Sequence, residues 1–304
     1  SQGQIDGVPL AWVDLLGGKT LADLGLGSDL LFAGHWEASQ TDTLHASLVL
    51  ERSAGDLRLL PGADGVMGAV VGYGTEQTRA RQRFGIAKAV SGLPAGAWHL
   101  LGDLTQAQRD EAALGWLLAP YQFNRYRPGK DTASPARLKT PEGCDAPSFI
   151  AMAAGEFLTR DLINTPAADM GPAELEDAFL TLAARFGAAT KVVRGDDLLA
   201  QNFPMIHAVG RASPRAPRLL EMNWGSTGPH LTLVGKGVCF DSGGLDLKPS
   251  SAMLLMKKDM GGAAHALALA DLVMGAGLKV RLHCLIPAVE NAVSGNAFRP
   301  GDVL

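Results

Sequence analysis

After residue 147, the chain alternates between stretches with helical spacing of apolar residues and short, continuous apolar runs. Helical spacing predicts helices over 148–164, closed by Thr165-Pro166, and over 172–186, which begins at a proline. The apolar runs predict strands at 191–193, 218–224, 230–234 and 279–289, and a helix at 261–277 separates the last two. We expect strand 230–234 to be buried. Helices and strands that alternate in this way are typical of βαβ units and of a mostly parallel sheet.

The first part of the chain mixes short apolar runs with glycine-rich turns. We expect strands at LLFAGHW, HASLVLE, DLRLLPG and MGAVVGYG. Helical spacing follows in RFGIAKAVSGL and TQAQRDEAALGWLLAPYQF, and Thr105 is expected to cap the second of these helices. Residues 125–147 are rich in proline and charge, which is typical of a linker. The pattern predicts a small N-terminal α/β domain at 1–125, a linker at 126–147 and a second α/β domain at 148–304.

Composition narrows the class of protein. With 47% hydrophobic and 19% charged residues among 304, the chain is long enough to bury a core in two domains. The net charge of −4 and the scattered arginines argue against a dedicated surface for binding nucleic acid, so we expect no nucleic-acid partner. No apolar run approaches the length of a membrane span, and the N-terminus shows no secretory pattern. Cys144, Cys239 and Cys284 form no CxxC pair, which favours free thiols in a reducing cytoplasm.

Strand 230–234 leads directly into Gly235-Lys236-Gly237. Loops at the carboxyl ends of strands are where open α/β sheets bind ligands. A phosphate-binding loop is excluded, because His230 stands where that motif needs glycine and Val238 where it needs serine or threonine.

Charged residues after this loop are candidates for a metal site. Asp241 lies in the glycine-rich turn FDSGG, Lys248 follows a short extended stretch, and Asp259 precedes the helix at 261–277. Carboxylates suit divalent metals, and a lysine can become a ligand where a neighbouring dication lowers its pKa. Taken singly, each is more simply a solvated charge, and Asp259 is also favoured by the helix dipole. The metal-site interpretation rests on the combination of Lys236, Asp241, Lys248 and Asp259.

Several other lysine, cysteine and histidine residues are better explained by structural roles than by a role in the metal site. We expect Lys257 and Lys258 to be exposed charges. Cys239 is favoured as a small buried residue over a soft metal ligand. His265, on the apolar face of its helix, is expected to be packed or hydrogen-bonded, and nothing in its spacing assigns His207 to a site.

The run VGKGVCFDSGGLDLKPSSAMLLMKKDMGGAA resembles the signature region of the leucyl aminopeptidase (cytosol aminopeptidase) family, peptidase family M17. PAVENAVSGNAFRPGDVL is similar to the family's ENxxSGxAxRPGDV segment, and ALGWLLAPYQFNRY and TRDLINTPAADMGP resemble segments before and at the start of its catalytic domain. The resemblance covers 112–304. It implies a small macro-like N-terminal α/β domain followed by a catalytic α/β metallopeptidase domain. The implied activity is metal-dependent release of N-terminal residues from peptides, with leucine and other apolar residues preferred.

Carried over residue by residue, the resemblance implies a role for each candidate. Lys236, Asp241 and Asp259 would bind two divalent ions, manganese or zinc, and Asp241 would bridge them. Lys248 would stay charged and donate a hydrogen bond to the peptide carbonyl oxygen, a catalytic and substrate-binding role. Met256 would line the pocket for the first side chain of the substrate.

The family's next motif, NTDAEGR, has no counterpart before Leu304. In the family it supplies an Asp and a Glu ligand and an Arg that anchors a bicarbonate acting as general base. We therefore expect the sequence to be an incomplete piece of a longer protein, and the catalytic domain at 148–304 to lack its C-terminal part. The resemblance also implies a cytoplasmic homo-hexamer that acts on peptides and has no membrane partner.

Two alternatives remain open. A non-catalytic or DNA-binding regulatory homologue of the same family would be favoured by a basic groove, which the net charge of −4 does not support. Another two-metal hydrolase, such as a phosphatase, would be expected to use a histidine-rich site, and residues 235–262 contain no histidine.

Overall fold

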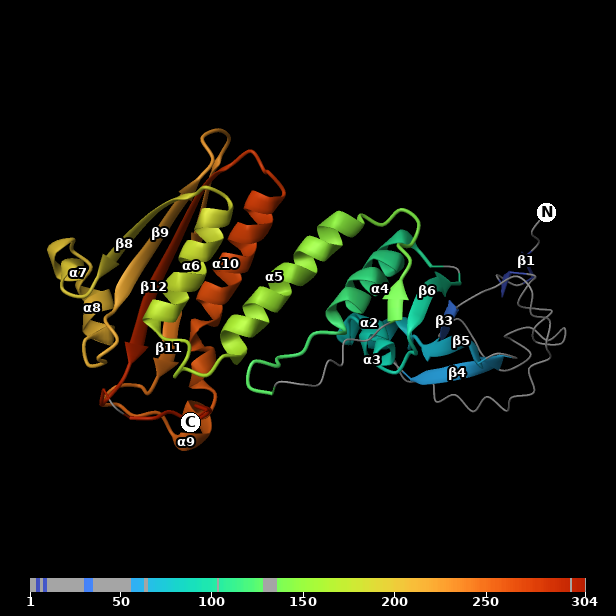
Figure 1. The fold of residues 1–304 in the computed structure, drawn as a ribbon, viewed down its shortest axis with the longest axis horizontal. Helices are drawn as coiled ribbons and strands as arrows, with labels where there is room; N and C mark the ends of the chain where they lie inside the picture. Colours follow the sequence, from blue (N-terminus) through green and yellow to red (C-terminus); the bar gives the residue numbers. More distant parts are fainter. Residues whose placement is uncertain are drawn as a thin grey trace. The chain divides into compact units, whose positions relative to one another are not determined.

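The computed structural model describes the backbone of residues 4–5, 8–9, 30–34, 56–62, 65–102, 104–127, 136–295 and 297–303. The chain divides into two compact units, Ser1–Ala153 and Ala154–Leu304 (Figure 1). None of the described helices has both the length and the hydrophobicity that crossing a membrane requires.

The first unit is built on a five-stranded mixed sheet. Its strands, in spatial order, are β4 (Leu57–Gly62), β5 (Gly65–Gly72), β3 (Leu30–Gly34), β6 (Gly96–Leu101) and β7 (Ala136–Leu138). β6 and β7 pair in parallel, and the other neighbours pair antiparallel. A separate antiparallel pair joins β1 (Gln4–Ile5) and β2 (Val8–Pro9). The strands predicted at LLFAGHW, DLRLLPG and MGAVVGYG are therefore found, whereas HASLVLE lies outside the described residues.

The helices of this unit are α2 (Glu76–Arg81), α3 (Ile86–Val90) and α4 (Gln106–Leu118). The helices predicted within RFGIAKAVSGL and TQAQRDEAALGWLLAPYQF are found as α3 and α4, whereas the sequence pattern does not predict α2. Thr105 caps α4 as predicted, because its Oγ1 accepts a hydrogen bond from the Gln108 N–H at 3.3 Å. In return, Gln108 Oε1 accepts one from the Thr105 N–H at 2.9 Å. This reciprocal pair satisfies two backbone donors at the start of the helix.

α5 (Ala146–Asn164) contains the helix predicted at 148–164 and spans the boundary between the two units. The predicted linker at 126–147 includes β7 and also residues 128–135, which lie outside the described part of the chain. The domain bounds given by the sequence therefore stay a prediction.

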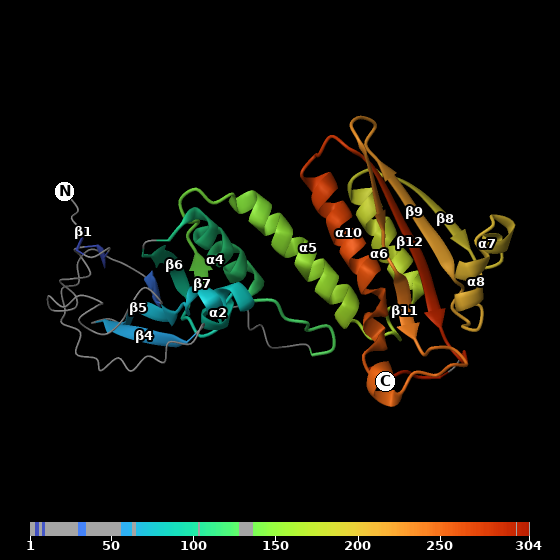
Figure 2. The same ribbon diagram turned by 180° about the vertical axis from the view of Figure 1, so that it is seen from behind.

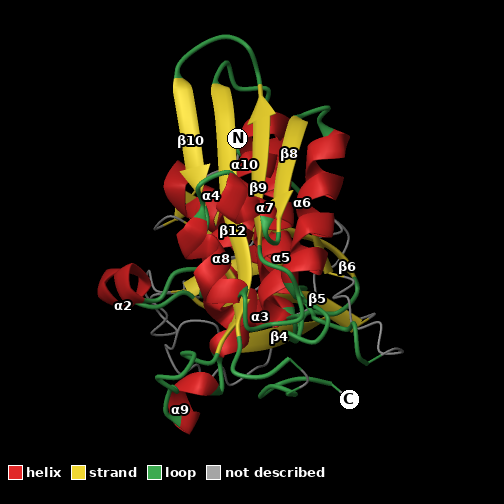
Figure 3. Ribbon diagram, turned by 90° about the vertical axis from the view of Figure 1, so that its left-hand side faces the viewer, coloured by secondary structure: helices red, strands yellow, loops and turns green. Residues whose placement is uncertain are grey.

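The second unit holds the other five-stranded sheet. Its strands are β8 (Ala189–Arg194), β9 (Arg218–Trp224), β10 (His230–Val234), β11 (Gly237–Asp241) and β12 (Arg281–Asn291). β10 and β11 pair in parallel with successive parts of β12, and β9 lies antiparallel between β12 and β8. All strands except β9 consequently run in one direction (Figure 3). The prediction of a mostly parallel sheet is confirmed in this sense.

Helices cover both faces of this sheet. The helices that lie wholly within this unit are α6 (Pro172–Arg185), α7 (Asp197–Ala200), α8 (Pro204–Gly210), α9 (Ser250–Met253), the 3-10 helix η1 (Met256–Met260) and α10 (Gly261–Gly275). α6 and α10 lie on one face, and α7 and α8 lie on the other (Figures 1 and 2). Phe179 of α6, Leu267 of α10 and Ile286 of β12 belong to one buried cluster. Leu198 of α7 packs in a second cluster with Leu219 of β9.

The expectation that strand 230–234 is buried is wrong. β10 lies at the edge of the sheet, where β12 is its strand partner, and the side chain of Val234 is 69% exposed. Leu231 and Leu233 are only partly buried against the core. A continuous apolar run does not distinguish an edge strand from a central one, because strand order is set by pairing with residues distant in the sequence.

Candidate functional site

Lys236 lies at the break between β10 and β11. Its carbonyl oxygen accepts a hydrogen bond from the Ala263 N–H at 2.9 Å, which ties the break to the first turn of α10. Glycines allow this approach, because a Cβ on Gly235 would lie 2.7 Å from Ala263 Cα and one on Gly262 would lie 2.9 Å from Lys236 N. The GKG and MGG glycines of the sequence therefore let the loop pack directly on the helix.

Asp259 lies in η1, immediately before α10, and its side chain is 17% exposed. Lys236 Nζ lies 2.7 Å from Asp259 Oδ2. Oδ2 is nevertheless buried and has no hydrogen bond of acceptable geometry to any described residue. Lys236 supplies an opposite charge, but its N–H groups are not aligned for a hydrogen bond to Oδ2. This oxygen can therefore still accept a hydrogen bond or coordinate a metal ion.

Asp241 ends β11 and accepts hydrogen bonds through both carboxylate oxygens. Oδ1 accepts from the Gly243 N–H at 3.0 Å and from Asn291 Nδ2 at 2.8 Å. Lys248 Nζ lies 3.1 Å from Oδ2. Burial opposes ionisation of this carboxyl, but the bonds from Gly243, Lys248 and Asn291 outweigh it and lower the pKa of Asp241. The carboxylate is therefore held in its charged form.

The turn after Asp241 requires glycine, as the FDSGG pattern predicts. Gly243 and Gly244 have φ angles of +91° and +75°, in the region that L side chains rarely adopt. A Cβ on Gly243 would also lie 2.3 Å from the carbonyl oxygen of Asp246. The Lys248 N–H donates to the Ser242 carbonyl at 3.0 Å, so the chain folds back on itself. This return places Lys248 beside Asp241.

The structure brings the predicted site residues together as two ion pairs, Lys236 with Asp259 and Lys248 with Asp241. β11 packs against η1, which joins the segments that carry them. Met256 opens η1 and is partly buried. Within the described residues, no group of three His, Cys, Asp or Glu side chains is arranged to hold a metal ion. A metal site here would combine carboxylates with a lysine, and the ligand and catalytic roles stay predictions.

Lys257 is not the exposed charge that the sequence predicts. Its Nζ donates to the carbonyl oxygens of Ile163 at 3.2 Å and of Asn164 at 2.5 Å, at the C-terminus of α5. Burial lowers its pKa. Lys258 is exposed, as expected. Lys257 thus anchors η1, which carries Met256 and Asp259, to the end of a long helix, a contact that sequence spacing does not reveal.

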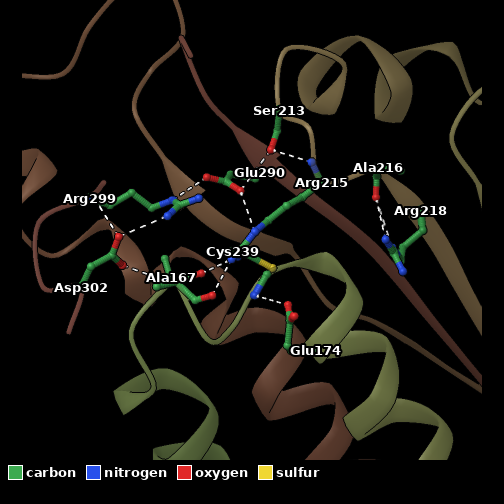
Figure 4. Close-up of polar contacts among 12 residues, drawn as sticks. Ala167, Glu174, Ser213, Arg215, Ala216, Arg218, Cys239, Glu290, Arg299 and Asp302 are labelled. Atoms are coloured by element: carbon green, nitrogen blue, oxygen red, sulfur yellow. Dashed lines mark hydrogen bonds and ion pairs between the residues drawn. The ribbon is translucent and has the colours of Figure 1, made fainter. Parts of the chain in front are cut away.

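A buried group of charges lies at the end of β12 (Figure 4). The Glu290 side chain is 3% exposed. Ser213 Oγ donates to its Oε2 at 3.1 Å, and Arg299 Nε donates to its Oε1 at 2.5 Å. Arg215 Nε lies 3.9 Å from Oε2. Buried carboxylates persist when they are paired and hydrogen-bonded in this way.

The same group fixes the loop at 297–303. Asp302 accepts hydrogen bonds from the backbone N–H groups of Ala168 and Arg299, each at 2.9 Å. Arg215 Nη1 donates to the Ala167 carbonyl at 2.6 Å. The ENxxSGxAxRPGDV pattern thus encodes a buried network of charges, and sequence reasoning assigned roles to none of its members.

The other candidates behave as structural residues. Cys239 is 1% exposed, and burial raises the pKa of its thiol. His265 Nδ1 is hydrogen-bonded to the Gly261 carbonyl at 2.7 Å, although its side chain is exposed rather than packed. His207 Nε2 lies 3.0 Å from Asp196 Oδ1.

Comparisons with known proteins give a consistent family. Residues 157–304 match the cytosol aminopeptidase family, catalytic domain, and residues 36–141 match the M17 aminopeptidase, N-terminal domain. A probable cytosol aminopeptidase of Corynebacterium efficiens is 34% identical over 267 residues, which are 83% of this chain and 52% of that protein.

Solved structures agree with the sequence relatives. The crystal structure of the cytosol aminopeptidase from Coxiella burnetii gives a TM-score of 0.70 at 42% identity, over 82% of this chain and 54% of that one. The bottromycin maturation enzyme BotP in complex with Mn also gives 0.70, at 33% identity, over 84% of this chain and 58% of that one. The chain spans about half the length of these relatives.

Proposed function

Because this chain belongs to the cytosol aminopeptidase family, we propose that it forms part of a metal-dependent aminopeptidase that releases N-terminal residues from peptides. The observation that carries the proposal is the presence of two lysine–carboxylate pairs, Lys236 with Asp259 and Lys248 with Asp241, on segments joined by the packing of β11 against η1. The expected preference is for leucine and other apolar first residues.

The residues present fit a divalent metal. Asp259 Oδ2 is buried, and the cation that balances its charge is the Lys236 ammonium, 2.7 Å away without an aligned hydrogen bond. A divalent ion would take the place of that ammonium beside a carboxylate oxygen that has no other partner. Asp241 is held as a carboxylate. Carboxylate oxygens suit manganese, and both they and nitrogen ligands suit zinc. Lys236, Asp241 and Asp259 would hold the metal. When bound, a pair of such ions would activate water and polarise the scissile carbonyl.

Lys248 supports the same reaction from this chain alone. Its side chain is 30% exposed, so the ammonium is open to a substrate while Lys248 Nζ stays 3.1 Å from Asp241 Oδ2. A fixed cation beside the site can donate a hydrogen bond to a peptide carbonyl and stabilise the negative charge that develops on its oxygen. Met256, in the segment that Lys257 anchors, is placed to contact the first side chain of the substrate.

The test is release of free leucine from a leucyl chromogenic amide by the complete purified protein of which this chain forms part, supplied with manganese or zinc. Lys248→Ala should lower kcat/KM by at least about 100-fold, as expected for loss of one oxyanion donor. Asp259→Ala should lower the metal content measured by mass spectrometry. Lys258→Ala, an exposed neighbour of Asp259, is the matched control and should retain both properties. A loss of less than about tenfold in Lys248→Ala would show that the role given to Lys248 is wrong.

Absence of metal from the complete, manganese-supplied protein, together with no release of leucine, would favour a non-catalytic homologue. The proposal extends to a homo-hexamer in the cytoplasm, and its support is family membership. Light scattering on the purified protein measures the assembly directly.

A further inference from the structure

Asn291 lies beside Asp241 because of the register between the last two strands of the second sheet. β11 and β12 pair in parallel, with Phe240 opposite Glu290 and Asp241 opposite Asn291. Successive residues of a strand point to opposite faces of the sheet, and paired residues share a face. Asn291 therefore shares a face with Asp241, and Glu290 points to the opposite one.

The contacts of Asn291 are directed at Asp241 and its turn. Nδ2 donates to Asp241 Oδ1 at 2.8 Å. An ionised carboxylate only accepts hydrogen bonds, so the amide nitrogen must be the atom that faces it. The Asn291 carbonyl oxygen accepts from Ser242 N at 3.0 Å and from Ser242 Oγ at 2.7 Å. One residue thus binds both the carboxylate and the backbone that follows it.

These bonds leave the two carboxylate oxygens of Asp241 with different surroundings. Oδ1 accepts from Asn291 Nδ2 and from the Gly243 N–H, whereas Oδ2 faces Lys248 Nζ at 3.1 Å. Two donors on Oδ1 fix the rotation of the carboxylate plane, so that the direction of Oδ2 is set before any ligand arrives.

The neighbouring residue gives Asn291 a rigid base. Glu290 is buried on the other face of β12 and is bound by Ser213 and Arg299 (Figure 4). The network continues through Asp302 to the Ala168 N–H. A residue whose side chain is locked in this manner fixes the strand end, and hence the backbone of Asn291.

We propose that Asn291 is a positioning residue that orients the Asp241 carboxylate toward a bound metal ion, with the buried Glu290 network as its support. The proposal rests on the metal-binding function proposed above. Partners that orient a ligand from behind typically change metal affinity about 10–100-fold when they are removed.

The experiment compares Asn291→Ala and Asn291→Leu with the wild-type protein. The leucine variant keeps the approximate size of the side chain but has no donor, so it separates the hydrogen bond from the loss of volume. Binding of Mn²⁺ alone is followed by the electron paramagnetic resonance signal of the free ion. We expect both variants to bind Mn²⁺ at least about tenfold more weakly.

Asn223→Ala is the matched control. Asn223 is an exposed asparagine of β9, a neighbour of β12, and its Nδ2 also donates to a carboxylate, Glu221 Oε1, at 3.3 Å. This variant should bind Mn²⁺ within about twofold of wild type, because its hydrogen bond belongs to no predicted ligand. Unchanged Mn²⁺ affinity in Asn291→Leu would overturn the proposal.

A second measurement needs no metal. The Gly243 N–H shares Asp241 Oδ1 with Asn291, so loss of Asn291 should loosen this bond and accelerate hydrogen exchange at Gly243 by at least about tenfold in metal-free protein. The thermal midpoint, measured alongside, shows whether the change is local. Unchanged exchange at Gly243 overturns the positioning role whatever the metal result. If wild-type protein binds no Mn²⁺, the proposed function fails, and the exchange measurement still decides whether Asn291 holds Asp241.

Discussion

Lys236 Nζ lies 2.7 Å from Asp259 Oδ2, so the first and last of the predicted ligands in the sequence form an ion pair. This pair requires a charged ammonium. A lysine that binds a metal must instead be neutral, because the lone pair on its nitrogen is the ligand. Lys236 therefore cannot pair with Asp259 as an ammonium and coordinate a metal at the same time. A substitution that keeps the charge but prevents coordination can distinguish the two roles.

Lys236→Arg tests this exclusion. Arginine keeps the positive charge and can still pair with Asp259, but it cannot be deprotonated in a protein. We expect Mn²⁺ affinity to fall at least about tenfold. The free energy of unfolding without metal should change by no more than about 1 kcal/mol, since the Lys236 side chain is 58% exposed and exposed pairs contribute little.

Calorimetric titration with Mn²⁺ and urea unfolding in the presence of a chelator give the two quantities. Lys258 is an exposed lysine next to Asp259 in the sequence, so Lys258→Arg should leave both the Mn²⁺ affinity and the free energy of unfolding unchanged. If Lys236→Arg bound Mn²⁺ as tightly as wild type, Lys236 would be a structural partner of Asp259 rather than a ligand.

Local signals in the sequence predict most elements of the second unit. The run at 218–224 forms β9 with the predicted bounds, and the helix predicted at 172–186 forms α6. β11 was not predicted, because Gly237–Asp241 reads as the approach to a glycine turn. Its strand conformation depends on parallel pairing with β12, whose residues are distant in the sequence.

The residues of the candidate site also divide into those that local sequence indicates and those whose contacts depend on distant parts of the chain. Lys236, Asp241 and Asp259 belong to one segment, so the sequence can single them out as candidates, and their roles as ligands stay a prediction. Asn291 and Lys257 act through partners on other elements. Their hydrogen bonds depend on strand register and helix packing, and no spacing along the chain encodes either.

Gly243→Ala tests the turn that returns Lys248 to Asp241. Gly243 combines a φ of +91° with a backbone oxygen 2.3 Å from the position of a Cβ. Positive φ costs an L residue about 1–2 kcal/mol, and steric overpacking adds about 1–3 kcal/mol. We expect a loss of about 3 kcal/mol in the free energy of unfolding, measured with urea, and a weaker affinity for Mn²⁺.

Gly277→Ala separates the two costs. Gly277 has a φ of +60°, but nothing lies within 4 Å of its added Cβ, so this variant should lose only about 1 kcal/mol. Equal losses in the two alanine variants would mean that the Asp246 carbonyl moves away freely and that the turn is not sterically specified.

Glu176 makes the stability of the second unit depend on pH. Its side chain is 7% exposed and accepts hydrogen bonds from Arg218 Nη1 at 2.6 Å and from Arg194 Nε at 3.0 Å. Burial opposes ionisation, but the two guanidinium groups outweigh it and lower the pKa of Glu176 below its ordinary value of 4.5. A lowered pKa in the folded state means that the stabilisation is fully present above pH 4.5 and is lost as the pH falls through the folded-state value.

Glu176→Gln should therefore destabilise the protein by about 3 kcal/mol at pH 7, because Arg218 is left buried without a counter-charge. The difference from wild type should shrink progressively below pH 4.5, as the wild-type carboxylate becomes protonated. Urea unfolding at pH 7, 5, 4 and about 3 measures the difference. Glu156→Gln, in the surface pair with Arg160 of α5, should cost less than about 1 kcal/mol at each pH. A difference that stayed constant down to about pH 3 would contradict the lowered pKa of Glu176, because a carboxyl with a lowered pKa in the folded state must lose its stabilisation as it becomes protonated.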